Sequence, residues 1–249
     1  MSGPAVRIAM WSGPRNISTA LMRSFAARSD CFVTDEPLYA HYLRQTGAEH
    51  PASEQVIAAH DPDWRRVAGY LTGPTPRGRS VWYQKHMTHH LAGLVPARDW
   101  EWILALTSAM LIRDPAEMIT SYIKVMPNPT PSDLGLPQQV ALFEWLAPRT
   151  GRTPAVVDSR DVLENPRGVL AALCGRLGIG FDERMLRWEP GPRATDGVWG
   201  PWWYHAVYRS TGFGAYAPKA EPVPPSLAGV LEECRGLYET LARLRVRAE

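Results

Sequence analysis

The sequence has few cysteines and no long apolar run. Its three cysteines, Cys31, Cys174 and Cys234, lie far apart and form no C-x-x-C pair. We therefore predict buried free thiols instead of disulfides or metal ligands. No stretch of about 18 apolar residues and no segment typical of a signal peptide occurs in the chain. We expect a soluble, cytoplasmic protein with no membrane partner.

Neither sign of charge is in large excess. The 249 residues include 27 lysines and arginines and 25 aspartates and glutamates, which gives a formal net charge of +2. This balance argues against a general nucleic-acid binder, so we expect no nucleic-acid partner, although a local basic pocket is compatible with it. The length suffices for one sizeable core. We expect a single domain over residues 1–249, with an aromatic-rich C-terminal subdomain at about 188–249.

Strand-like and helix-like segments alternate along the chain. Short apolar runs predict five strands, over Val6–Trp11, Cys31–Thr34, Ser80–Lys85, Ala109–Arg113 and Pro154–Asp158. Helical spacing predicts helices over Ser18–Arg28, Ala116–Val125, Leu136–Leu146 and Pro166–Leu177. This alternation predicts a three-layer α/β fold, with a largely parallel central sheet and helices on both faces. We expect Gly47–Arg79 to be a partly looped region with weak helical patches, and the Pro-rich Met126–Asp133 to be a loop or lid without regular structure.

The C-terminal part of the chain is rich in aromatic residues. Residues Trp188–Tyr216 contain four tryptophans and three tyrosines. A helix is predicted over Pro225–Arg247, because Leu227, Cys234 and Leu241 belong to one apolar stripe. We expect this helix to pack on the domain, and the alternative is a homodimer seam.

Residues 11–21, WSGPRNISTAL, join the first predicted strand to the first predicted helix. The ATP-binding pattern G-x-x-x-x-G-K-[ST] is incomplete here, because Ile17 and Ser18 stand in place of its second glycine and its lysine. The free N–H groups and the dipole of a helix N-terminus nevertheless attract an anion. Arg15 adds a positive charge, while Asn16, Ser18 and Thr19 add neutral donors. We interpret the loop as an anion site, and the alternative is a helix start with Ser18 as N-cap.

A second motif is Leu111–Tyr122, LIRDPAEMITSY. Arg113 ends a predicted strand, and Ser121 lies in the helix that follows. The carboxyl end of a strand in an open α/β sheet is where ligands bind. The alternative is a surface arginine that pairs with Asp114 or Glu117.

Two further segments offer a general base at the same edge of the sheet. The segment QKHMTHH contains His86, His89 and His90, but no carboxylate or cysteine follows at a spacing typical of metal ligands. We therefore favour a histidine that acts as acid or base, and we expect no metal. Glu36 leaves the second strand in Asp35-Glu36-Pro37, where the alternative is a loop acid that caps the next helix.

Taken in this order, the motifs resemble the sulfotransferase family, which uses 3′-phosphoadenosine 5′-phosphosulfate as donor. Pro14–Thr19 is similar to that family's 5′-phosphosulfate loop, with Arg15 in place of its lysine. Arg113-Asp114-Pro115 followed by Ser121 matches its 3′-phosphate motif. Segments similar to later family motifs are Val157–Pro166, Leu173–Gly178 and Gly197–Trp202. Thr195-Asp196 replaces a basic pair found in many relatives, and Arg193 is the candidate substitute.

The resemblance implies a P-loop-type fold and transfer of a sulfuryl group to a hydroxyl or amine of a small-molecule or carbohydrate acceptor. The donor is the co-substrate, and the residues implied to bind it are Arg15, Asn16, Ile17, Ser18, Thr19, Arg113 and Ser121. Arg15 would also stabilise the leaving phosphate. Glu36 or His86 would be the base, with Glu36 favoured because it leaves its strand beside the phosphosulfate loop. The alternatives are an ATP-dependent P-loop kinase and a non-catalytic nucleotide-binding relative.

Overall fold

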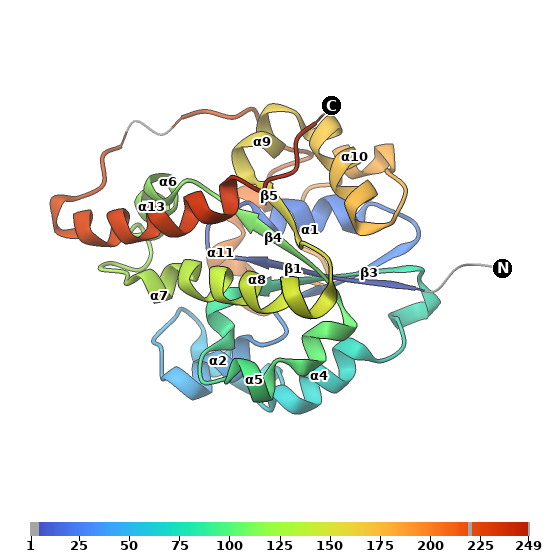
Figure 1. The fold of residues 1–249 in the computed structure, drawn as a ribbon, viewed down its shortest axis with the longest axis horizontal. Coiled ribbons are helices and arrows are strands. Elements are labelled where there is room, and N and C mark those ends of the chain that lie inside the picture. Colours follow the sequence, from blue (N-terminus) through green and yellow to red (C-terminus); the bar gives the residue numbers. More distant parts are fainter. Residues whose placement is uncertain (1–4, 219–220, 249) are drawn as a thin grey trace.

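The sheet at the centre of the molecule contains five parallel strands. The computed structural model describes residues 5–218 and 221–248. The strands are β1 (Val6–Ser12), β2 (Cys31–Asp35), β3 (Val81–Met87), β4 (Thr107–Ile112) and β5 (Ala155–Asp158), in the order β2-β3-β1-β4-β5 (Figure 1). Every neighbouring pair is parallel. The predicted α/β fold with five strands is therefore confirmed.

Helices connect the strands and cover the sheet. The first half of the described chain contains α1 (Ser18–Ala26), α2 (Tyr39–Thr46), α3 (Ser53–Ala59), α4 (Trp64–Thr72) and α5 (Pro96–Asp99), with 3-10 turns at Pro76–Gly78, Thr88–Leu91 and Glu101–Ala105. The second half contains α6 (Pro115–Tyr122), α7 (Pro131–Leu134), α8 (Leu136–Thr150), α9 (Ser159–Glu164), α10 (Pro166–Leu177), α11 (Gly200–Trp203), α12 (His205–Tyr208) and α13 (Ala228–Ala242), with 3-10 turns at Glu183–Leu186 and Pro225–Leu227.

Both segments predicted to contain loops also contain helices. This agrees with the helical patches expected in Gly47–Arg79, whereas the prediction that Met126–Asp133 has no regular structure is wrong at its end. Between residues 47 and 79 lie α3 and α4, and α4 begins where the Asp63 side chain accepts a hydrogen bond from the Arg65 N–H. Within residues 126–133, α7 begins with a capping box formed by Thr130 and Asp133. Its Pro131 occupies the first helical position, where a missing N–H costs nothing. Local caps therefore outweigh the Pro-rich composition.

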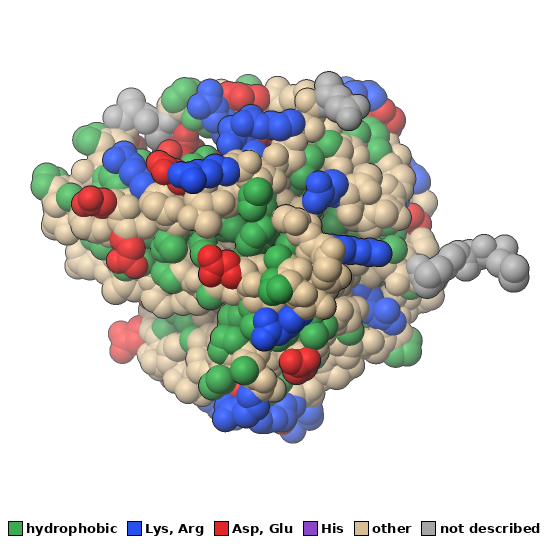
Figure 2. Space-filling view, in the orientation of Figure 1, with side chains coloured by type: hydrophobic (Ala, Val, Ile, Leu, Met, Phe, Trp, Pro, Cys, Tyr) green, Lys and Arg blue, Asp and Glu red, His purple; other side chains and the backbone are tan. Residues whose placement is uncertain are grey.

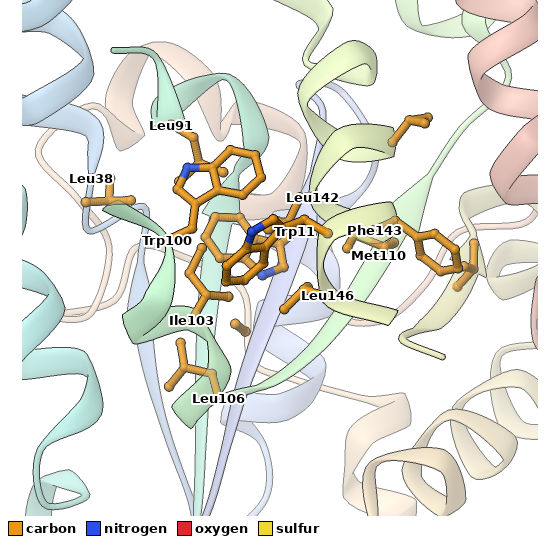
Figure 3. Packing of buried hydrophobic residues seen from close by; sticks show 14 of the residues in the cluster. Trp11, Leu38, Leu91, Trp100, Ile103, Leu106, Met110, Leu142, Phe143 and Leu146 are labelled. Carbon is orange, nitrogen blue, oxygen red and sulfur yellow. The ribbon is translucent and has the colours of Figure 1, made fainter. Parts of the chain in front are cut away.

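The sheet has a hydrophobic core on each face, because side chains alternate along a strand. On β1, Ala9 and Trp11 point into a cluster with Trp100, Ile103, Leu142 and Leu146 (Figure 3). Ile8 and Met10 point the other way, into a cluster with residues of α1 and α10, including Leu21, Met22, Phe25, Leu170 and Leu173. Both faces are thus buried, as a parallel sheet requires.

The long C-terminal helix packs on the domain. α13 buries Cys234 and Leu241, and its Tyr238 hydroxyl donates to Asp158 Oδ2 at 2.6 Å. The helix ends at Ala242, five residues earlier than predicted, and Leu244 is half exposed. All three cysteines are buried and free, as predicted.

The outer surface carries charges of both signs. On the face in Figure 2, acidic and basic side chains are interspersed among neutral ones. Among the described residues, no helix is long and apolar enough to cross a membrane.

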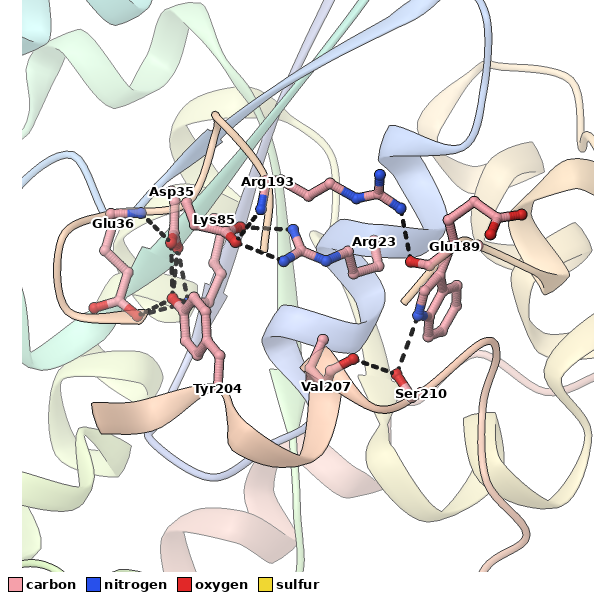
Figure 4. A network of polar contacts seen from close by, with 12 residues as sticks. Arg23, Asp35, Glu36, Lys85, Glu189, Arg193, Tyr204, Val207 and Ser210 are labelled. Atoms are coloured by element: carbon pink, nitrogen blue, oxygen red, sulfur yellow. Dashed lines mark hydrogen bonds and ion pairs between the residues drawn. The ribbon is translucent and has the colours of Figure 1, made fainter. Parts of the chain in front are cut away.

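A buried ion pair attaches the segment before α11 to α1. Arg23 Nη1 and Nη2 donate to the two carboxylate oxygens of Asp196 at 2.6 and 2.7 Å, and both side chains are at most 5% exposed (Figure 4). Asp196 also accepts from the Arg193 N–H at 2.7 Å. The aspartate that replaces a basic residue of the family pattern is therefore the partner of a buried arginine of this chain.

We predict that Asp196→Ala lowers the free energy of unfolding by about 3–5 kcal/mol, because it leaves the Arg23 guanidinium buried without a counter-charge. Urea denaturation monitored by circular dichroism measures the change. The control is Glu164→Ala, which breaks the exposed pair with Arg160 and should cost less than about 1 kcal/mol. Equal losses in the two variants would contradict a structural role for the buried pair.

Candidate active site

The carboxyl ends of the central strands meet at a cavity of about 270 Å³. Its walls come from the loop at residues 14–20, the ends of β2 and β3, the turn after β3, helix α6 and residues 203–207. The sequence places these segments far apart, and the parallel sheet brings them to one edge. Of the predicted site residues, all except His86 line this cavity.

The loop after β1 has an unusual backbone. Arg15 and Ile17 adopt positive φ angles of 64° and 56°, and Ile17 is the N-cap of α1. Ser18 is the first helical residue, so the alternative with Ser18 as N-cap is wrong. Gly13 has no room for a side chain, because an added Cβ would lie 2.3 Å from the Leu134 carbonyl oxygen. The chain therefore passes closely under α7 before it turns into the helix.

Polar contacts hold this loop against the neighbouring strands. Asn16 Nδ2 donates to the Leu111 carbonyl at 3.2 Å, and Ser159 Oγ donates to the Asn16 carbonyl at 3.0 Å. Asn16 is fully buried. Its side-chain amide is thus an anchor of the loop in this structure, and the donor role predicted for it stays a prediction.

Two arginines and a serine converge on the loop. Arg15 Nε donates to Ser121 Oγ at 3.0 Å, and Arg113 Nη1 donates to the Arg15 carbonyl at 2.6 Å. Burial, and then the charge of Arg113, lower the pKa of Arg15. Among the described residues, Arg15 has no carboxylate partner in this structure. A partly buried guanidinium next to a second one favours the arrival of an anion.

Arg113 lies at the ligand-binding edge of the sheet and also pairs with Glu117, so both interpretations of its motif apply in part. It lines the cavity, its Nε donates to Glu117 Oε2 at 2.9 Å, and its Nη2 forms an ion pair with the same oxygen at 2.8 Å. Tyr216 donates its hydroxyl to the other oxygen of Glu117 at 2.7 Å. Glu117, which also accepts from Tyr216, thereby holds the Arg113 side chain at the cavity.

Glu36 belongs to a buried network around one ammonium group. Lys85 Nζ donates to Asp35 Oδ1 at 2.8 Å, to Glu36 Oε1 at 2.5 Å and to the Tyr204 hydroxyl at 2.7 Å (Figure 4). The Tyr204 hydroxyl donates to Asp35 Oδ2 at 2.7 Å. Trp199 Nε1 donates to the same hydroxyl at 2.8 Å. Residues 197–204 are thereby fastened to the ends of β2 and β3.

The network changes the proton affinity of its members. Burial raises the pKa of Glu36, the positive charge of Lys85 opposes this shift, and the charge of Asp35 adds to it. Burial opposes the charged form of Lys85, but the two carboxylates outweigh it and raise the pKa of the ammonium. A carboxylate with a raised pKa that lines a cavity is a candidate general base.

His86 does not reach the cavity, so the structure gives no support to the base role considered for it. Side chains alternate along β3, and Lys85 and Met87 line the cavity while His86 points to the opposite face. There its ring stacks on Trp11 with centroids 4.2 Å apart. Burial lowers the pKa of His86 to about 3. This histidine is a neutral core residue.

Two other histidines of the same segment lie at the cavity. His90 Nε2 is 3.9 Å from Glu36 Oε2, and its ring stacks on Tyr39 and Tyr42. His89 lines the cavity beside it. Their position in QKHMTHH was visible in the sequence, but the 3-10 turn that directs them inward was not. No group of three or more His, Cys, Asp or Glu side chains in the described part of the chain is placed to hold a metal ion.

Arg193 also lies elsewhere than expected. Its Nη2 donates to the Glu189 carbonyl at 2.6 Å (Figure 4), and it lines a separate hollow beside α1. Arg193 therefore does not line the cavity, and its substitution for the missing basic pair stays a prediction without support from this structure. Arg15 and Arg113 are the arginines that line the cavity.

Comparison with solved structures supports the fold. A sulfotransferase from Alicyclobacillus acidocaldarius superimposes with a TM-score of 0.60 at 10% identity, over 98% of both chains. The sulfotransferase domain from the curacin biosynthetic pathway superimposes with a TM-score of 0.52 at 17% identity, over 97% of this chain and 99% of that one. At these identities the likeness shows the fold alone.

Comparison with known sequences shows the family. Two Arabidopsis thaliana proteins, named branched-chain-amino-acid aminotransferase-like proteins 2 and 1, are each 36% identical to this chain, over 93% and 97% of its length. The chain spans only 40% and 42% of those proteins. The family model described as a sulfotransferase domain matches residues 6–238. The resemblance noted from the motifs is confirmed, and the chain belongs to the sulfotransferase domain family.

Proposed function

We propose that this chain is an enzyme that transfers a sulfuryl group from 3′-phosphoadenosine 5′-phosphosulfate to an acceptor hydroxyl. The observation that carries the proposal is the convergence of Arg15, Arg113, Ser121 and Glu36 on one cavity. The first three suit an anionic donor, and Glu36 suits the removal of a proton. A carboxylate with a raised pKa that lines the cavity suits a general base, and this favours an enzyme over a non-catalytic relative.

The proposed reaction is an in-line displacement at sulfur. Glu36 accepts the proton of the acceptor hydroxyl while the acceptor oxygen forms a bond to sulfur. The bond between sulfur and the bridging oxygen of the 5′-phosphate breaks, and that oxygen retains the electron pair. Arg15 stabilises the negative charge that develops on the leaving phosphate. Arg113 and Ser121 hold the 3′-phosphate and thereby select this donor.

An ATP-dependent kinase is the weaker alternative. Its loop would need the lysine and the second glycine that are absent between Gly13 and Thr19. A sulfuryl donor requires neither a γ-phosphate nor a magnesium ion to hold it. The backbone of the loop and Arg15 are then sufficient for the 5′ end of the nucleotide.

The first prediction from the proposed function concerns donor recognition. Adenosine 3′,5′-bisphosphate should bind about tenfold to a hundredfold more tightly than AMP, because hydrogen bonds to a charged group contribute about 1.5–3 kcal/mol. Arg113→Ala should remove most of this ratio, as measured by isothermal titration calorimetry. Arg113→Ala also removes the hydrogen bond to the Arg15 carbonyl and could weaken the binding of the 5′-phosphate. Both nucleotides carry that phosphate, so this loss cancels in the ratio of their affinities.

The matched control is Arg160→Ala, which removes an exposed arginine that does not line the cavity. The ratio should stay unchanged in this variant. Equal affinities for the two nucleotides in the unmodified protein would refute the proposed donor and favour the kinase.

The second prediction concerns the base. Glu36→Gln should lower kcat by about 10²–10⁴-fold, the range for general-base catalysis, and leave the affinity for the bisphosphate almost unchanged. Because the pKa of Glu36 is raised, kcat/KM should rise with pH above the ordinary glutamate range, and the variant should lose this rise. His86→Gln, which alters a residue outside the cavity, should reduce kcat far less. The reverse ranking would assign the base role to His86.

A further inference from the structure

The part of the cavity lining outside the donor loop, Arg113 and Ser121 consists mainly of aromatic and apolar side chains. We call it the acceptor side and define it by Tyr39, His90, Tyr122, Trp203, Tyr204 and Val207, which line the same cavity as Glu36. They come from α2, the turn after β3, α6, α11, α12 and the residue between the last two helices. Tyr39 and Trp203 belong to one hydrophobic cluster, which also contains Leu43, Val56 and Trp199.

The acceptor side has no cation available for an anionic substrate. Among the described residues that line the acceptor side, Lys85 is the one lysine or arginine. Its ammonium already donates to Asp35, Glu36 and Tyr204. The two carboxylates exceed the ammonium by one negative charge. A carboxylate or phosphate on the acceptor would therefore meet Glu36 without a counter-charge.

The histidines at the cavity do not supply such a charge. Burial lowers the pKa of His50, His89 and His90, so their imidazoles are neutral near pH 7. Arg15 and Arg113 are on the donor side and hold the loop and Glu117 there. The two ends of the cavity thus differ in charge.

We propose that the acceptor is an uncharged alcohol with an apolar body, and that anionic acceptors are excluded. This inference rests on the proposed function and narrows its substrate class. An amine is less suitable, because it would arrive as an ammonium and must lose a proton before it can attack. The hydroxyl would lie at Glu36, with the apolar body between Tyr39, Trp203 and Val207.

A matched pair of small alcohols tests the charge limit. 2-Phenylethanol and 3-phenyllactate share the ring and the hydroxyl, and they differ by a carboxylate on the carbinol carbon. In the presence of saturating adenosine 3′,5′-bisphosphate, calorimetry should show at least tenfold tighter binding of 2-phenylethanol. Equal or tighter binding of 3-phenyllactate would overturn the inference. A failure of 2-phenylethanol to bind would overturn it as well.

A designed change of preference locates the site. Val207 is half-buried at the cavity wall, so Val207→Arg should improve the binding of 3-phenyllactate relative to 2-phenylethanol by at least tenfold. Val198→Arg is the control, because Val198 is 39% exposed and does not line the cavity. The same change in both variants, or in neither, would show that the alcohol binds elsewhere and would overturn the inference.

The two proposals can fail separately. Equal binding of the bisphosphate and AMP would remove the proposed donor, whatever the alcohols do. A normal nucleotide ratio together with preference for 3-phenyllactate would leave the sulfotransferase proposal intact and overturn only the acceptor class.

Discussion

The arrangement of the cavity depends on one buried ammonium group. Lys85 is fully buried in β3, and its Nζ reaches carboxylates at the end of β2 and the hydroxyl of Tyr204, which lies 119 residues further along the chain. A buried charge must be paired, because its desolvation costs several kcal/mol. The ammonium therefore constrains where Asp35, Glu36 and residues 197–204 can lie. Residues 197–204 are thereby held against the carboxyl ends of β2 and β3.

The same constraint explains the chemistry expected of Glu36. Two carboxylates compete for one ammonium, and Asp35 also accepts hydrogen bonds from the Tyr204 hydroxyl and the Gly197 N–H. Asp35 thus accepts more hydrogen bonds than Glu36, and burial together with the charge of Asp35 raises the pKa of Glu36. Asp35, which pairs with Lys85, and Glu36, the candidate base, are thus neighbours in the sequence. Their difference in hydrogen bonding gives them different tasks.

The sequence alone predicted those features of the fold and the site that depend on short segments of the chain. Apolar runs predicted the five strands, and the rule that ligands bind at the carboxyl ends of parallel strands placed Arg15, Glu36 and Arg113 near one another. His86 shows the limit of this reasoning. A shift of one residue along a strand turns a side chain to the other face, and nothing local shows that Lys85 faces the cavity and His86 the core. Tyr204 could not be predicted, because its role arises from a contact across most of the chain.

The loop at residues 13–19 shows how a sequence without the usual glycine can still turn from β1 into the N-terminus of α1. A left-handed conformation costs a residue other than glycine about 1–2 kcal/mol, and both Arg15 and Ile17 adopt it. Such strain persists only where surrounding contacts outweigh it. Here the carbonyls of Arg15 and Asn16 accept hydrogen bonds from Arg113 and Ser159, which follow β4 and β5. Strands on one side of β1 thus hold the backbone of the loop, and Arg113 contributes to its shape as well as to its charge.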